Sequence, residues 1–445
     1  MKKYITLLLI IGLTCLGCKK FLDEKPRQSL TVPETLTDFQ ALLEKELESE
    51  QDPKWGEVST DDFYYEDAIL AAKEQVERNA YQWDKGNVFG TDVDMEWFYD
   101  YRFVYHTNTV LEGLEKVERT ASNQAQWDRI KGEALFFRAK CHLSIVNIWA
   151  RGYDAATAQT DPGIPLRLNT DFNEVSVRGT LAETYGQIIK DLTTSIDLLP
   201  VIPSHVVRPS RPAALGLLSR VNLFMRNYDE CIKYADACLQ LKNDLLDYNT
   251  LTTTAAFPIP AFNKEVIYHS NFSTALPNSR INLDLYKMFG TSDLRKKIFF
   301  KDNGNGTYSF KGSYWGASKL FAGLAVDEVY LMRAECYARK GDITAALADL
   351  NTLMKSRSDK SAFVPYTATD AKAALNLILI ERRKELLLRG IRWPDVKRLN
   401  NGGELISLKR TINGTDYILL PNDPRFALPI PQPIIDLTGM IQNSR

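Results

Sequence analysis

Apolar residues spaced three and four positions apart recur along most of the chain and predict long amphipathic helices. The first such stripe lies within residues 94–117 and contains Trp97, Tyr101, Val104, Leu111 and Leu114. The second contains Ile130, Ala134, Phe137, Cys141, Ile145 and Ile148. A third helix is predicted from Thr180 to Leu199, because Thr180 and Glu183 have capping-box spacing and Pro200 ends the pattern.

Two later segments, residues 211–241 and 326–357, have the pattern of a helix, a short turn and a second helix. Their turns, 226–228 and 341–343, resemble the turn of a tetratricopeptide repeat. Small or apolar residues follow at the repeat's packing positions: Cys231, Ala235 and Cys238 in one segment, and Ala346, Leu350 and Leu353 in the other. The turns lie 115 residues apart. We therefore predict a mostly α fold with interrupted tetratricopeptide-repeat helix pairs.

The insertion between these pairs, from about residue 248 to 325, has a different composition. It is rich in Thr, Asn, Phe and Tyr, and residues 302–312 predict a hairpin around Asn303-Gly304. Insertions between repeats tend to lie on one face, which is often the binding face. We therefore expect this loop- and hairpin-containing insertion to contribute to function.

The N-terminus has the features of a secretion signal. Lys2 and Lys3 precede an apolar run, residues 4–16, which is shorter than the roughly 20 residues of a membrane span. The following Leu16-Gly17-Cys18 resembles a bacterial lipobox, in which the Cys18 thiol carries a diacylglycerol. We predict a signal peptide (1–17), a lipid-anchored tether (18–36) and a single helical domain (37–445). A simple signal peptide with an incidental cysteine is the alternative.

Composition gives no reason to expect nucleic acid as a partner. The formal net charge is −1, and loss of the two signal-peptide lysines would make it −3. Cys231 and Cys238 are about 10 Å apart on one predicted helix, beyond the roughly 7 Å that a disulfide spans. These two cysteines, Cys141 and Cys336 include no CxxC motif, so we expect buried thiols and neither a metal site nor a cofactor.

No motif indicates catalysis. The histidines (106, 142, 205 and 269) are scattered, and the chain has no HExxH, GxSxG or P-loop sequence. A glycoside hydrolase needs two carboxylates about 5 to 10 Å apart, and no loop motif selects such a pair among 56 acidic residues. We therefore predict a protein that is not an enzyme, with a glycoside hydrolase as one alternative.

Four stretches in order resemble the SusD/RagB family of outer-membrane nutrient-binding lipoproteins. They are CKKFLDEKP (18–26), EWFYDYRFVYHTNTVLEGL (96–114), IERRKELLLRGIRWPDVKRL (380–399) and LPIPQPIIDLTGMIQN (428–443). The chain departs from the family pattern at Leu388-Arg389, where an acidic residue is usual before Gly390, and at Pro394, where an aromatic residue is common.

The resemblance implies four interrupted tetratricopeptide pairs and attachment through Cys18 and its acyl chains, such as palmitate, to the cell outer membrane, facing the exterior. It implies nutrient uptake with a SusC-type TonB-dependent β-barrel transporter, for which the family member is the lid. The ligand would be an oligosaccharide, or in some members a peptide. A tetratricopeptide lipoprotein that scaffolds outer-membrane assembly is the second alternative, although it would have tandem repeats.

Charged residues in the third stretch predict a structural salt-bridge network. They are Glu381, Arg382, Arg383, Glu385, Arg392, Asp395 and Arg398. Carbohydrate binding needs aromatic faces for sugar C–H groups and polar side chains for hydroxyls. Candidates outside the helical stripes are Tyr64, Tyr65, Tyr314, Trp315, Trp55 and Trp83, with Asp61, Asp62 and Asn271 beside them. Packing is the alternative for each, and Trp97, Trp149 and Trp393 are predicted to be core residues.

Overall fold

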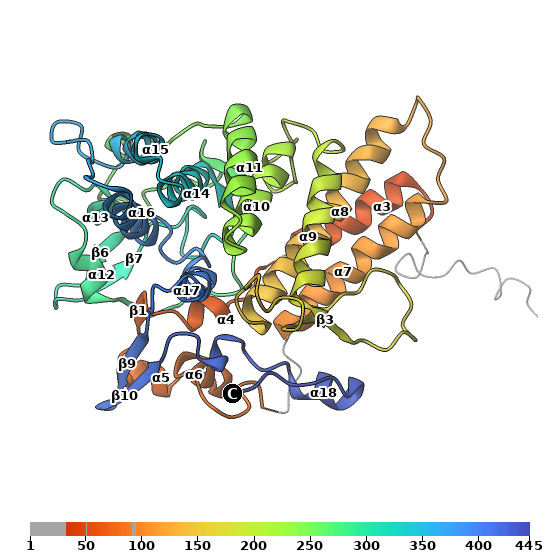
Figure 1. Cartoon of the computed structure of the whole chain (residues 1–445), viewed down its shortest axis with the longest axis horizontal. Coiled ribbons are helices and arrows are strands. Elements are labelled where there is room, and N and C mark those ends of the chain that lie inside the picture. Colours follow the sequence, from red (N-terminus) through yellow and green to blue (C-terminus); the bar gives the residue numbers. More distant parts are fainter. Residues whose placement is uncertain (1–32, 50, 91–94) are drawn as a thin grey trace, which may run out of the picture.

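The computed structural model describes residues 33–49, 51–90 and 95–445 (Figure 1). The predicted signal peptide, Cys18 and nearly all of the tether lie outside the described residues. The long helices are α3 (Leu36–Ser49), α7 (Met95–Leu114), α8 (Gln124–Trp149), α9 (Leu181–Ile196), α10 (Arg211–Phe224), α11 (Tyr228–Leu241), α14 (Val326–Arg339), α15 (Ile343–Lys355), α16 (Ala371–Glu385) and α17 (Arg392–Asn401). The short helices are α4 (Trp55–Val58), α5 (Asp67–Ala71), α6 (Gln75–Tyr81), α12 (Leu283–Lys287), α13 (Arg295–Ile298) and α18 (Gln432–Thr438).

Strands are short and pair two by two in antiparallel ribbons. The pairs are β1 (Phe63–Tyr64) with β5 (Arg280–Ile281), β2 (Pro162–Pro165) with β3 (Arg178–Thr180), β4 (Val266–Tyr268) with β8 (Leu324–Ala325), β6 (Phe300–Asp302) with β7 (Tyr308–Phe310), and β9 (Leu408–Ile412) with β10 (Thr415–Leu419). The structure is therefore mostly α, as predicted.

Helices α3, α7, α8 and α9 pack side by side at one end of the molecule (Figure 1). The predicted capping box begins α9: the Thr180 hydroxyl accepts a hydrogen bond from the Glu183 amide (3.1 Å), and the Glu183 carboxylate accepts one from the Thr180 amide (2.7 Å). This helix ends at Ile196, three residues before the predicted end. Trp97 and Trp149, predicted to be core, are 4% and 0% exposed.

The two predicted helix–turn–helix segments are present as α10–α11 and α14–α15. Helix α11 packs against α14, so the pairs are neighbours in space although the insertion separates them in sequence (Figure 1). All six small or apolar packing positions named from the sequence are buried. A Cβ on Gly216 would lie 2.5 Å from Leu324, which shows how closely α10 approaches β8.

The predicted hairpin in the insertion is confirmed as β6–β7. Its loop is longer than a two-residue Asn-Gly turn, because the Asn303 amide donates to the Thr307 carbonyl (3.1 Å). Gly304 and Gly306 both have positive φ, 79° and 78°, which glycine adopts without steric cost. Cys141, Cys231, Cys238 and Cys336 are free and buried, as predicted. Within the described part of the chain, no helix is long and apolar enough to cross a membrane.

Candidate functional site

The charged residues of the third family-like stretch form a buried ion-pair network, which confirms the structural role predicted for them. The Glu385 carboxylate lies between the guanidinium groups of Arg295 (2.9 Å) and Arg357 (2.7 Å), and all three side chains are fully buried. Arg382 and Arg398 both pair with Asp395 at 2.7 Å. These contacts join α16 and α17 to each other and to the insertion.

Arginines of the same network form ion pairs with Asp61 and Asp62. Arg392 pairs with Asp61 (2.8 Å), and Arg383 pairs with Asp61 and Asp62 (both 3.0 Å). Burial and the charge of Asp62 raise the pKa of the nearby Glu57 carboxyl to about 8. This acidic segment therefore connects α4 to the C-terminal segment.

Four of the six aromatic candidates are enclosed by protein in this structure. The Tyr65 hydroxyl donates to Glu77 (3.0 Å), the Trp83 indole to the Ser59 carbonyl (3.0 Å), and the Tyr314 hydroxyl to Glu265 (2.7 Å). Trp55 packs edge-on against Phe89, with ring centroids 5.7 Å apart. In this conformation these rings have no open face, so the ligand-binding role predicted for them stays a prediction that the geometry does not support.

Tyr64 and Trp315 are half-buried and retain open surface. Tyr64 precedes the buried Tyr65, and Trp315 follows the buried Tyr314, so in each pair one aromatic side chain is buried and its neighbour is partly exposed. Tyr64 lies on β1, paired with Arg280 of β5, whereas Trp315 lies in the loop between β7 and β8. The two candidates belong to different surroundings, and only Trp315 is part of an aromatic cluster.

This cluster, here called the aromatic platform, consists of His205, Phe262, His269 and Trp315. Trp315 stacks on His269 with ring centroids 4.9 Å apart and planes inclined by 29°. Phe262 lies 4.5 Å from His269 and 4.6 Å from His205, again between centroids. Phe262 is 48% exposed and His269 only 4%, so the histidine is the floor of a platform open to solvent.

The His269 imidazole is buried without a hydrogen-bond partner in the described part of the chain. Neither ring nitrogen has a hydrogen-bond partner within the described residues, although both are buried. Burial lowers the pKa of His269 to about 4, so the ring is neutral at pH 7, with one N–H donor and one acceptor nitrogen. Buried polar atoms are normally paired, so ordered water can serve this ring, whereas a ligand would reach it only if the rings that pack on it moved.

Backbone geometry holds the platform together. Gly316 has φ +73°, and a Cβ there would lie 2.6 Å from the Ala261 amide nitrogen. The Trp315 loop therefore lies directly on the segment that carries Phe262. Phe262 itself has φ +54°, a left-handed conformation that is unusual for a bulky residue and that concentrates at functional sites.

Sequence reasoning missed Phe262, His205 and His269. The sequence does mark Phe262 as a loop aromatic. It ends the apolar segment Phe257–Phe262, and the prolines at positions 258 and 260 prevent this segment from forming a regular helix or strand. Nothing in the local sequence marks the two histidines as neighbours. They come together through the hydrogen bond from the His269 amide to the Val206 carbonyl (2.8 Å), 63 residues away in sequence.

A groove of about 380 Å³ lies between α7, residues 165–176 and α18. Phe98, Phe172 and Leu437 line it and are 46%, 80% and 83% exposed. Phe172 packs on Tyr105, with centroids 4.8 Å apart. The polar groups here bond to one another: Arg167 to the Asp171 and Glu174 carbonyls, and Asn169 to the Glu174 carboxylate. The groove therefore offers mainly apolar surface.

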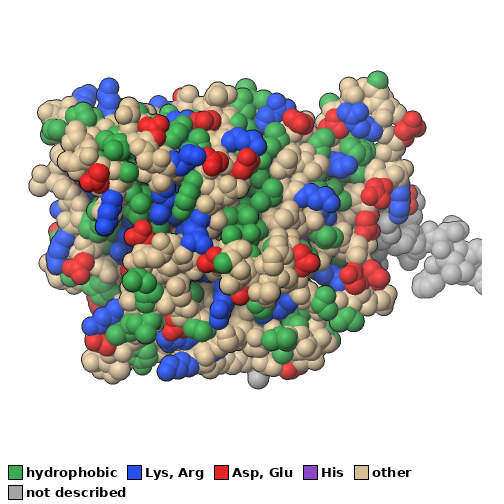
Figure 2. All heavy atoms as spheres, in the orientation of Figure 1, with side chains coloured by type: hydrophobic (Ala, Val, Ile, Leu, Met, Phe, Trp, Pro, Cys, Tyr) green, Lys and Arg blue, Asp and Glu red, His purple; other side chains and the backbone are tan. Residues whose placement is uncertain are grey.

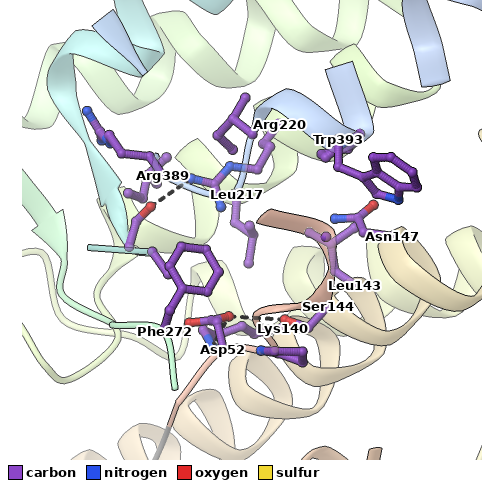
Figure 3. A pocket seen from close by; sticks show the side chains of 18 of the residues that line it. Asp52, Lys140, Leu143, Ser144, Asn147, Leu217, Arg220, Phe272, Arg389 and Trp393 are labelled. Atoms are coloured by element: carbon purple, nitrogen blue, oxygen red, sulfur yellow. Dashed lines mark hydrogen bonds and ion pairs between the residues drawn. The ribbon is translucent and has the colours of Figure 1, made fainter. Parts of the chain in front are cut away.

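A third space is a partly open cavity of about 80 Å³ lined by α4, α8, α10, the start of α17 and nearby loop residues (Figure 3). Asp52 contacts Lys140 (2.9 Å) and Ser144 (3.1 Å) on one wall, and Arg220 donates to the Gly323 carbonyl (2.9 Å) on another (Figure 3). At roughly 30 Å³ per water molecule, this volume suits a few waters. It is too small for a sugar ring.

Charged side chains of both signs are interspersed over the face shown in Figure 2. No group of three or more His, Cys, Asp or Glu side chains is arranged to hold a metal ion in the described ranges. Of the three spaces, the aromatic platform is the one that combines open aromatic surface with unpaired polar atoms.

Comparison with known proteins gives a consistent result. A family model described as "Starch-binding associating with outer membrane" matches residues 20–223, and a model described as "SusD family" matches residues 326–442. A SusD superfamily protein from Bacteroides thetaiotaomicron has 22% identity and a TM-score of 0.76, covering 92% of this chain and 100% of that one. One from Bacteroides vulgatus has 19% identity and a TM-score of 0.74, with coverage of 92% and 99%. A "Laminarin binding SusD-like protein" has 17% identity and a TM-score of 0.67, with coverage of 92% and 98%. A search of curated proteins found no match.

Proposed function

This chain belongs to the SusD family, and on that premise we propose that it captures oligosaccharides at the outer membrane and delivers them to a SusC-type TonB-dependent β-barrel transporter as its lid. The family is one of carbohydrate-binding, outer-membrane-associated proteins. The ligand class, the anchor and the partner of this chain are part of the proposal, and a peptide ligand is the variant within it.

The observation that carries the proposal is the aromatic platform. A pyranose presents a face of C–H groups that packs on an aromatic ring, and its hydroxyls need hydrogen-bond partners. Phe262 supplies open ring surface and Trp315 a partly exposed ring, and the buried His269 beneath them has no hydrogen-bond partner among the described residues. All lie in the insertion, which the helix pairs hold in place, and binding residues are commonly found in loops on a rigid scaffold.

Attachment is proposed from Leu16-Gly17-Cys18. Cleavage before Cys18 and acylation of its thiol would hold the protein on the membrane by two or three chains, enough for stable anchoring. For the transporter contact we propose the groove lined by Phe98, Phe172 and Leu437. Large exposed apolar patches commonly mark interaction sites, and here the neighbouring polar groups leave few partners for sugar hydroxyls.

The first test is glycan binding by the purified mature chain, measured by affinity electrophoresis and calorimetry against a panel of plant, algal and host polysaccharides. Trp315→Ala should weaken binding by about tenfold or more, because it removes both stacking and buried apolar area. Phe172→Ala is the control, since Phe172 is an exposed aromatic residue outside the platform. Release of shortened oligosaccharides would favour the glycoside hydrolase instead. Failure to retain any glycan would refute oligosaccharide capture and leave only the peptide variant.

The second test is an affinity pull-down of the lipidated protein from detergent-solubilised outer membranes. A stoichiometric large β-barrel supports the lid role. Recovery of periplasmic assembly factors without a barrel would favour the scaffold function.

A further inference from the structure

We infer that the aromatic platform is built for an acidic oligosaccharide, one that carries carboxylate or sulfate groups. This inference rests on the proposed function, because it specifies the ligand of the same site. It is carried by the distribution of charge around the platform rather than by the aromatic rings.

Three segments build the rim of the platform: residues 200–210, 255–264 and 311–325. Together they contain His205, Arg208, Lys264, Lys311 and Lys319 and no Asp or Glu. The segment that carries His269, residues 265–270, contains one acidic residue, Glu265, which is fully buried and paired with Arg357 (2.8 Å). The whole chain has 55 basic and 56 acidic residues, so the imbalance is local. Neutral sugars do not require such a bias, whereas an anionic ligand is attracted by it.

Two of these cationic side chains, Arg208 and Lys311, already bind other groups of the protein. Arg208 pairs with Glu44 and with Glu133 (3.2 Å). The Lys311 ammonium donates to the carbonyls of Thr253 (2.7 Å) and Ala255 (3.2 Å). They position the rim and are not available to a ligand.

The other two lysines are available. Within the ranges that the structure describes, neither Lys264 nor Lys319 forms an ion pair, and Lys264 is exposed. The Lys319 ammonium lies 5.2 Å from the centre of the Trp315 ring. A neutral sugar that stacked on this ring would displace the ammonium, whereas an acidic sugar could pair with it and stack at the same time.

The experiment compares matched ligands that differ in charge. Oligogalacturonates are tested against their methyl esters, and sulfated keratan oligosaccharides, which contain no uronate, against their neutral desulfated forms, by calorimetry with the mature chain. We expect each acidic form that binds to do so about tenfold tighter than its neutral counterpart at about 50 mM NaCl, and the difference to shrink at about 300 mM NaCl, because salt screens exposed charges. The pair that shows the difference identifies carboxylate or sulfate as the recognised group.

Lys319→Gln and Lys264→Gln should each weaken binding of the acidic form by about three- to tenfold and leave a neutral form unchanged. Lys301→Gln is the matched control, because Lys301 is an exposed lysine on β6, outside the three segments. Equal or tighter binding of neutral glycans, or acidic binding that is indifferent to both lysines, would overturn this inference and leave glycan capture standing. If no glycan of either kind binds, oligosaccharide capture fails, and the inference fails with it.

Discussion

The Trp315 indole stacks on the His269 imidazole with centroids 4.9 Å apart, and this contact joins the β7–β8 loop to the residue that follows strand β4. The loop can reach this position only because Gly316 has no side chain. The platform therefore depends on one backbone contact as much as on its aromatic rings.

Gly316→Ala should damage ligand binding while leaving the helical scaffold intact. The added Cβ would meet the Ala261 amide nitrogen at 2.6 Å, so the loop must move away from the segment that carries Phe262. We expect glycan affinity to fall by about tenfold and the free energy of unfolding by about 1–3 kcal/mol, from the positive φ and the displaced contact.

Gly304→Ala in the β6–β7 loop separates these two effects. Gly304 has φ +79°, similar to that of Gly316, but a Cβ there would have nothing within 4 Å. Gly304→Ala should lower the free energy of unfolding through a similar backbone strain and leave glycan affinity unchanged. Equal loss of affinity in both variants would show that the contact with Ala261 does not position the platform.

Glu385→Gln should destabilise the protein strongly. It keeps the shape of the side chain but removes a charge held between Arg295 and Arg357, all fully buried. Because breaking a buried pair leaves uncompensated charge, we expect a loss of about 3 kcal/mol in urea unfolding at pH 7.

Glu230→Gln provides the surface comparison, since its pair with Lys233 is largely exposed and should be worth about 0–1 kcal/mol. A Glu385→Gln protein as stable as wild type would mean that the network is dispensable for folding.

The contribution of Glu57 to the stability of the protein should fall between about pH 5 and about pH 8. Its folded-state pKa is raised from 4.5 to about 8, by burial first and then by the Asp62 charge. Between these values the folded state holds a proton that the unfolded state has released, so raising the pH favours unfolding.

Glu57→Gln cannot titrate, and its unfolding free energy should therefore decline less across this range, by about 1–3 kcal/mol. Urea titrations of both proteins at several pH values measure the difference. Parallel pH profiles for the two proteins would contradict the raised pKa.

The sequence predicted the helices well because their pattern is local. The Thr180–Glu183 capping box and the small residues at Cys231 and Ala235 need only near neighbours to be recognised, and each occupies the expected position. The network of the C-terminal stretch was predictable for the same reason, since its charges alternate along one segment.

The candidate site was harder because burial of loop aromatics is decided by distant residues. Tyr314 and Trp315 are adjacent and similar in sequence context, yet Tyr314 is buried against Glu265 and Asp327 while Trp315 reaches the surface. Asp61 is of a residue type that commonly binds sugar hydroxyls, but it pairs with Arg392, 331 residues later. Neither partner is visible in the local pattern.

Phe172→Asp should weaken association with the proposed transporter and leave glycan binding unchanged. Phe172 is 80% exposed in the apolar groove, so a carboxylate there has little effect on folding, but it would have to be desolvated when an apolar partner surface covers it. We expect recovery of the β-barrel in the pull-down to fall by about tenfold, as for a central interface residue.

Val364→Asp is the matched control, because Val364 is 77% exposed and lies in the loop between α15 and α16, away from the groove. If both variants recover the barrel as wild type does, the groove is not the contact surface. If Phe172→Asp instead abolishes glycan binding, the groove belongs to the ligand site, and the division between ligand platform and partner groove proposed here is wrong.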